Sequence, residues 1–174
     1  MIKINPLGLE TPPPMATYFF DASAIVKLVL EEPGAAKSRQ AFDEAGQVCT
    51  SWVVIGEALG VLKRKWSRKE VSDKAYGKAV HLLMAFVREG RLMAIDLAVD
   101  KDRPTLATYE IDIIETRARY PNLDAADALQ FAVIQNTFLR HSAGASKTQL
   151  VSADRELLAA ARREGLSVLD VSDD

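Results

Sequence analysis

The sequence lacks the residues that several common kinds of site require. It contains one cysteine, Cys49, and two histidines, His81 and His141, in 174 residues. An internal disulfide is therefore impossible, and two histidines so far apart in the chain do not form a zinc motif. Glycine-rich nucleotide-binding motifs and the GxSxG motif of serine hydrolases are also missing. The single thiol suggests a reducing compartment, and we expect a cytoplasmic protein.

Long apolar runs and a strong excess of one charge are absent as well. The longest uncharged stretches, residues 45–56 and 128–139, are shorter than the roughly 18 residues that cross a bilayer. Residues 1–14 have no apolar core like that of a signal peptide. The 22 basic and 24 acidic residues give a formal net charge of −2, so no global positive field attracts nucleic acid or a membrane surface. We expect no membrane association, and any contact with phosphates must come from a local patch.

What is present is an alternation of short apolar strands and helices. The prolines of Thr11–Pro14 fix an extended arm, so we expect a leader over residues 1–15 and one domain over residues 16–174. Strands are predicted over residues 18–20, 48–50, 92–95, 150–152 and 167–171. Strands that alternate with helices predict an α/β fold, a three-layer αβα sandwich around a parallel sheet.

Capping residues and glycines set the predicted helices. They cover about residues 22–30, 35–45, 51–65, 67–90, 102–120, 124–140 and 154–165. Ser67 is the predicted cap of the fourth helix, because Glu70 follows it in capping-box spacing.

Four carboxylates stand where predicted strands end and helices begin. Asp21 directly follows the strand 18–20, and Asp154 follows the strand 150–152 after one intervening residue. Glu57 lies in an otherwise apolar helix that starts at the end of the strand 48–50, and Asp127 lies near the start of another helix. Because the carboxyl ends of parallel strands face one crevice, we expect all four acids to converge there.

Such a convergence has a chemical consequence. Each close pair of carboxylates would repel by about 4 kcal/mol, so protons or a divalent cation must compensate. An all-oxygen site suits Mg²⁺ or Mn²⁺, which can support hydrolysis of a phosphodiester. Each acid also has a plainer interpretation as a helix cap or a solvated side chain. Asp124, a predicted cap, lies about 60° around the helix from Asp127 and is a further candidate ligand.

Four stretches in order resemble the PIN-domain family, and in particular the VapC-type ribonuclease toxins. They are YFFDASA with Asp21 and Ser23, SWVVIGEALGVLKR with Glu57 and Arg64, DALQFAV with Asp127, and VSADREL with Ser152 and Asp154. The resemblance implies a Mg²⁺- or Mn²⁺-dependent endoribonuclease with the four acids around the metal and the two serines as supports for the acids. Gln130 stands where the family commonly has histidine.

The resemblance also implies partners and leaves alternatives open. Family toxins commonly form homodimers and are silenced by a cognate antitoxin protein. The chain is longer than a minimal toxin, because of the leader and a segment over residues 96–122. An RNA-processing or DNA-flap nuclease without an antitoxin, and a catalytically silent PIN-like binding module, are therefore alternatives.

For contact with RNA the best local patch is the basic run over residues 63–69. Arg64 follows Glu57 by two helical turns on nearly the same face, so it could hold a phosphate near the metal, with Lys63 and Arg68 beside it. The same charges could simply favour a helix C-terminus. Trp66 could stack a base, although packing is the commoner role. The apolar helix 71–86 is either core or a dimer or antitoxin surface.

Overall fold

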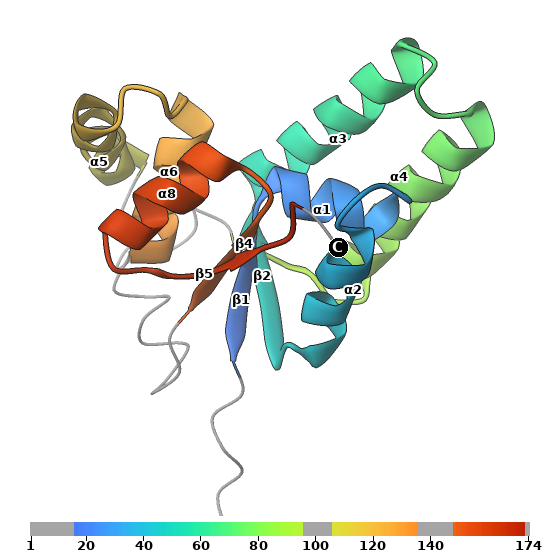
Figure 1. Ribbon diagram of the computed structural model, residues 1–174, viewed down its shortest axis with the longest axis horizontal. Coiled ribbons are helices and arrows are strands. Elements are labelled where there is room, and N and C mark those ends of the chain that lie inside the picture. The colour runs from blue at the N-terminus through green and yellow to red at the C-terminus, as the bar shows by residue number, and fades with distance from the viewer. Residues whose placement is uncertain (1–15, 96–105, 136–147, 173–174) are drawn as a thin grey trace, which may run out of the picture.

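The computed structural model describes residues 16–95, 106–135 and 148–172, and its centre is a parallel sheet (Figure 1). The strands are β1 (Thr17–Phe20), β2 (Gln47–Ser51), β3 (Met93–Ile95), β4 (Gln149–Ser152) and β5 (Ser167–Asp170). Their order is β3-β2-β1-β4-β5, and every neighbouring pair is parallel. The predicted leader, the predicted start of a helix at residues 102–105 and its neighbour's end at residues 136–140 lie outside the described residues.

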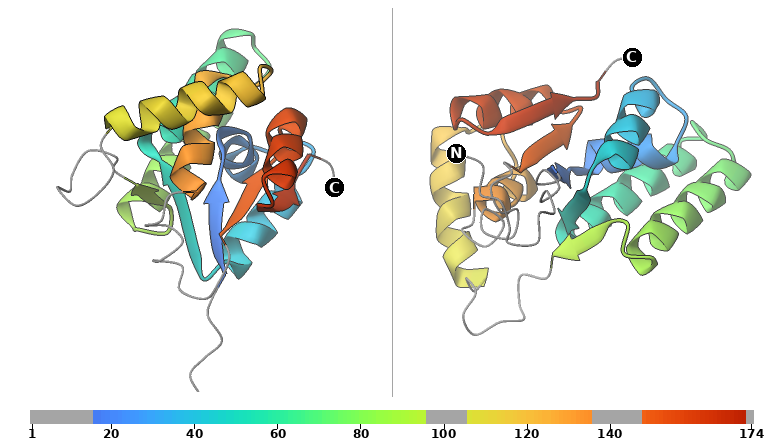
Figure 2. Two further views of the ribbon diagram at one scale, coloured as in Figure 1. Left: turned by 90° about the vertical axis from the view of Figure 1, so that its left-hand side faces the viewer. Right: turned by 90° about the horizontal axis from the view of Figure 1, so that it is seen from below.

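Helices cover both faces of this sheet. One layer contains α1 (Ala22–Val29), α2 (Ala35–Glu44), α3 (Trp52–Ser67) and α4 (Asp73–Arg88), and the other contains α5 (Leu106–Arg119), α6 (Ala125–Gln135) and α8 (Arg155–Arg163). Figures 1 and 2 show the two groups on opposite sides of the strands, with α3 and α4 as a long helical hairpin. The predicted αβα sandwich is confirmed.

The central strand explains why the chain needs both layers. Phe19 and Phe20 are adjacent in β1 and therefore point to opposite faces, and both are fully buried. A strand that buries consecutive large side chains must be covered on both sides, as parallel sheets are. Cys49 in the neighbouring strand is also fully buried and free, and burial raises the pKa of its thiol to about 12. That thiol is therefore an inert part of the core.

The strand order places a switch point beside β1. From β1 the chain builds β2 and β3 on one side, and it later returns to add β4 and β5 on the other. At such a point the connections that follow two neighbouring strands run in opposite directions and leave a crevice at the carboxyl ends. The crevice between β1 and β4 is therefore the candidate ligand-binding site.

The structure corrects the predicted start of α4. A helix was expected to begin at Ser67, but Ser67 is the last residue of the continuous helix α3. Ser72 caps α4, with its hydroxyl accepting a hydrogen bond from the Ala75 amide at 3.2 Å. The chain reverses at Lys69, which has a left-handed φ of 59°, so the capping-box spacing of Glu70 was misleading.

Trp66 is part of the packing that closes this hairpin. Its ring stacks on Tyr76 at 5.2 Å between centroids, and its indole nitrogen donates to Asp73 at 2.7 Å. Along α4, Leu83 is fully buried and both Val80 and Val87 pack against the core. These contacts support the packing role for Trp66 and the core role for this face of α4. In the part of the chain that the structure describes, no helix has both the length and the apolar character needed to cross a bilayer.

Candidate active site

Asp21 lies at the switch point, directly after β1, where it caps α1. Its side chain is 3% exposed, and Oδ1 accepts a hydrogen bond from the Ala24 amide at 2.7 Å. The backbone amide of Asp21 donates to the carbonyl of Val151 in β4 at 3.1 Å. Asp21 is therefore held between the two central strands, with its carboxylate at their carboxyl ends.

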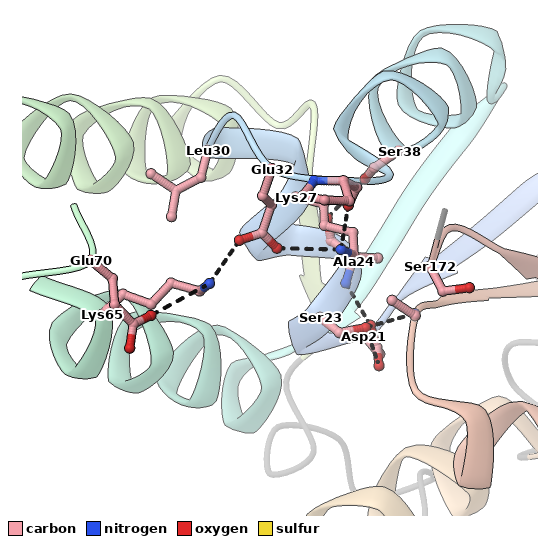
Figure 3. Close-up of polar contacts among 12 residues, drawn as sticks. Asp21, Ser23, Ala24, Lys27, Leu30, Glu32, Ser38, Lys65, Glu70 and Ser172 are labelled. Carbon is pink, nitrogen blue, oxygen red and sulfur yellow. Dashed lines mark hydrogen bonds and ion pairs between the residues drawn. The ribbon is translucent and has the colours of Figure 1, made fainter. Parts of the chain in front are cut away.

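Two serines connect this carboxylate to β4. Ser23 donates to Oδ1 of Asp21 at 2.8 Å, and Ser152 donates to Oδ2 at 2.7 Å. Each serine also accepts a backbone hydrogen bond, Ser23 from the Ala153 amide at 2.7 Å and Ser152 from the Asp154 amide at 2.9 Å. Figure 3 shows the Asp21 carboxylate with Ser23 and the start of α1 around it. The two hydroxyl groups fix the carboxylate and also shape the turn that leads to Asp154.

Asp154 is the cap of α8. Its Oδ1 accepts from the amides of Glu156 and Leu157 at 2.8 and 2.9 Å, while the residue as a whole is exposed. One carboxylate oxygen thus satisfies the start of the helix, and the other accepts no hydrogen bond from the residues that the structure describes. The sequence left open whether Asp21 and Asp154 serve as caps or as site residues, and the structure shows that both are caps whose carboxylates lie at the crevice.

Asp124 and Asp127 form a reciprocal cap at the start of α6. Asp124 Oδ1 accepts from the amides of Ala126 and Asp127 at 2.8 and 2.9 Å, and Asp127 Oδ2 accepts from the Asp124 amide at 3.3 Å. The sequence favoured a capping role for Asp124, which this geometry confirms. The same geometry brings its charge to the site, since Asp124 is the strongest charged neighbour of both Glu57 and Asp127.

The acids act on one another electrostatically. Burial first, and then the charges of Asp124, Asp127 and Asp21, raise the pKa of Glu57 to about 7. Burial and the charges of Asp124, Asp154 and Asp21 raise the pKa of Asp127 to about 7. For Asp21, burial raises the pKa to about 6 against the opposing effect of its hydrogen bonds. The structure therefore brings the four predicted acids, together with Asp124, into one electrostatic group.

The donor set of this group fits a hard divalent cation. All its candidate ligands are carboxylate oxygens, and Oε2 of Glu57 is buried without a hydrogen-bond partner among the described residues. A buried carboxylate oxygen with no partner is costly unless a cation or a proton satisfies it. Within residues 16–95, 106–135 and 148–172, no three acidic, histidine or cysteine side chains are gathered closely enough to make a ready-formed metal cage. The metal-ligand role of the acids therefore stays a prediction.

The three basic residues proposed for RNA contact differ in their surroundings. The positive charge of Arg64 lowers the pKa of Glu57, which burial and the neighbouring acids raise. The Arg64 guanidinium lies beside Gly60, 3.7 Å from the position that a Cβ would take on that glycine. Arg64 therefore folds back along α3 toward the acids. Lys63 instead lies over the Trp66 ring at 4.0 Å, and Arg68 is exposed with Glu70 at 4.0 Å. Of the three, Arg64 is the one directed at the site.

Sequence reasoning missed one set of ion pairs and did not give the surroundings of Gln130. Lys65, from the same basic run, pairs with Glu32 at 2.9 Å, and Glu32 pairs with Lys27 at 3.4 Å, which ties α3 to the end of α1 (Figure 3). Gln130, at the position where the family commonly has histidine, is 2% exposed, and its Oε1 has no hydrogen-bond partner in the part of the chain that the structure describes. The Lys65–Glu32 pair has no short-range sequence signal, because Lys65 lies on α3 and Glu32 lies in the distant connection between α1 and α2.

Comparison with known proteins agrees with this geometry. The family model described as the PIN domain matches residues 18–174. Among solved structures, the crystal structure of PAE2754 from Pyrobaculum aerophilum is similar with a TM-score of 0.55 and 21% sequence identity, and the match covers 90% of each chain. At that identity the likeness shows a shared fold. No curated protein matches the chain.

Proposed function

The chain belongs to the PIN domain family, whose members are typically metal-dependent nucleases, and on that basis we propose that it is a Mg²⁺- or Mn²⁺-dependent endoribonuclease. The observation that carries the proposal is the group of five mutually repelling carboxylates at the switch point. In the folded chain this repulsion is a standing cost, which a divalent cation would remove.

Each acidic residue has a definite part in this proposal. Asp21, Glu57, Asp127 and Asp154 would hold the cation, with Asp124 at its edge. A cation there supplies charge neutralisation at the phosphate and a more acidic water. Ser23 and Ser152 keep the Asp21 carboxylate in one orientation. Glu57 presents a partner-free oxygen to the site.

In this proposal the substrate is held by positive charge beside the acids. Arg64 lies on the α3 face that carries Glu57, so it would bind a phosphate of the RNA beside the acids. Lys63 and Arg68 would contact phosphates of the same RNA strand farther from the acids. The chain has a net charge of −2, so this local patch must supply the attraction that the whole surface does not.

A panel of substrates tests this activity. The wild type should cleave one or more of tRNA, ribosomal RNA fragments and other single-stranded RNA in Mg²⁺ or Mn²⁺, while Asp21→Asn and Asp154→Asn should not. Cleavage that persists in both variants, in preparations free of contaminating nuclease, would refute the assignment of these acids. Cleavage of single-stranded DNA alone would refute the ribonuclease and favour the alternative of a DNA nuclease.

We also propose that this nuclease is the toxin of a toxin–antitoxin pair and acts as a homodimer. Exposed apolar side chains, Trp52 at 51% and Val53 at 41%, stand at the start of α3 and are suited to contact with a protein partner. Expression of the chain without a partner should then arrest growth, and Glu57→Gln should abolish the arrest. Normal growth with an active enzyme would point to an RNA-processing nuclease. Light scattering tests the dimer.

A further inference from the structure

A groove lies along one face of α8. It lies between that helix and the chain that connects α5 to α6, and it encloses about 100 Å³. Asn122 and Glu156 line one end, and Arg163 lines the other. Asn122 stands two residues before Asp124, and Glu156 stands two residues after Asp154, so the first end opens beside the proposed metal ligands.

The groove has a rigid aromatic wall. The Tyr120 ring stacks on Phe131 at 6.3 Å between centroids, and its hydroxyl donates to Glu164 at 2.9 Å. Glu164 also pairs with Arg119 at 2.8 Å. Because the ring is held by contacts on two sides, a planar ligand in the groove would meet an ordered surface rather than a mobile side chain.

The polar groups near the acids are suited to the edge of a nucleobase. Glu156 is exposed, and Asn122 donates to it only at 3.5 Å, so both groups remain available to a ligand. A carboxylate accepts hydrogen bonds from the exocyclic amino group of cytosine, adenine or guanine, and the amide of asparagine both donates and accepts. Uracil carries a carbonyl oxygen in place of the amino group of cytosine, so it offers the carboxylate only its N3–H and would bind less favourably.

The far end of the groove is suited to a phosphate. Arg163 makes no ion pair among the residues that the structure describes, whereas Arg119 beside it is paired with Glu164. Arg163 lies nine positions after Asp154 along α8, and nine positions span about 13 Å at the rise of an α-helix. Arg163 is therefore far enough from the acids to meet a different phosphate from the one that is cleaved.

We propose that this groove binds a nucleotide that flanks the cleaved bond, with a preference for bases that carry an amino group, and that Arg163 binds the phosphate beyond it. This inference rests on the proposed nuclease, since it assigns the path of the same substrate. Tyr120 and Leu123 form the wall, Glu156 and Asn122 read the base edge, and Arg163 fixes the strand.

Binding can be measured without cleavage in an Asp127→Asn background. Fluorescence anisotropy with 12-nucleotide oligo(rA), oligo(rC) and oligo(rU) gives the affinity at several salt concentrations. Arg163→Gln should lower the slope of log affinity against log salt by about 0.7, the value for one phosphate contact to a single strand. Arg162→Gln is the matched control, because it removes the same charge from the adjacent position, whose charge acts on Asp170 rather than on the groove.

The base preference gives a second readout. Oligo(rC) and oligo(rA) should bind roughly fivefold more tightly than oligo(rU), and Glu156→Gln should remove most of that difference. Equal salt slopes for Arg163→Gln and Arg162→Gln, or a base ranking that Glu156→Gln leaves unchanged, would overturn the inference. Binding that depends on Arg163 and Glu156 in a chain whose wild type never cleaves RNA would refute the proposed nuclease, and with it the flanking position, and would leave the groove as a nucleotide-binding site alone.

Discussion

Replacement of Asp127 by asparagine should stabilise the metal-free protein at neutral pH. Burial and the neighbouring acids raise the pKa of Asp127 from 3.8 to about 7, so its ionised form is disfavoured in the folded chain. A shift of about three units corresponds to a ceiling of about 4 kcal/mol, and partial exposure to solvent reduces this to about 1–2 kcal/mol. Asparagine keeps an oxygen that can accept the Asp124 amide while removing the charge.

The sign of this effect depends on pH. The folded pKa lies above the unfolded value, so the carboxylate costs no stability below pH 4, and its cost grows until it is complete above pH 7. In thermal melts with EDTA, Asp127→Asn should therefore melt about 5 °C above the wild type at pH 8 and level with it near pH 4. Asp112→Asn, an exposed acid on α5, is the matched control and should not change the melting temperature. A variant that is less stable than the wild type at pH 8 would refute this account of the repulsion.

Three further predictions concern the frame of the site. Gly34→Ala should destabilise the fold by about 3 kcal/mol in urea unfolding, because φ is +83° and a Cβ would lie on the Val171 carbonyl oxygen. Gly77→Ala, where a Cβ meets nothing, should instead stabilise by about 0.5–1 kcal/mol, and equal effects of the two changes would contradict this reasoning. Ser152→Ala should cost about 1–2 kcal/mol and raise the pKa of Asp21 as seen by NMR titration, because the lost hydrogen bond favours the charged form; an unchanged pKa would count against it. Arg64→Gln should lower kcat/KM for RNA more than Lys63→Gln, since Lys63 lies on Trp66, and the opposite order would contradict the assigned direction of Arg64.

Much of the sheet could be predicted because its signals are local. The runs that became β1 and β4 are short, apolar and followed at once by Asp21 and by Ser152 with Asp154. In a parallel sheet, position after a strand fixes which edge a side chain occupies, whatever the rest of the chain does. For that reason the order of strands and helices was enough to predict that Asp21 and Asp154 lie at the same edge of the sheet.

The α3–α4 hairpin shows where local reasoning fails. Ser67 and Glu70 have the spacing of a capping box, yet Ser72 is the cap. The decision is made by tertiary contacts, in which Trp66 stacks on Tyr76 and bonds to Asp73 across the turn. From the local sequence alone, Ser67 and Ser72 are both plausible caps, whereas in the packed hairpin only Ser72 caps the helix.

The roles of the basic residues 63–69 also depend on tertiary contacts that the local sequence does not show. A run of five cations within residues 63–69 indicates a basic patch, but the structure gives these cations different surroundings. Lys65 pairs with Glu32, a residue of the α1–α2 connection, and Lys63 lies on Trp66. Only the folded structure separates the cations that hold the hairpin from Arg64, which is directed at the acids.

The most direct test of the site is the rate of RNA cleavage as a function of Mn²⁺ concentration for the wild type and for Glu57→Gln. Glu57 carries the buried oxygen without a partner, and Glu115→Gln, an exposed acid on α5, serves as the control. The account predicts cleavage by the wild type and the control that rises with Mn²⁺ and stops with EDTA, and a loss of at least about a hundredfold in Glu57→Gln. Cleavage by Glu57→Gln at the rate of the wild type, or cleavage that persists in EDTA, would contradict it.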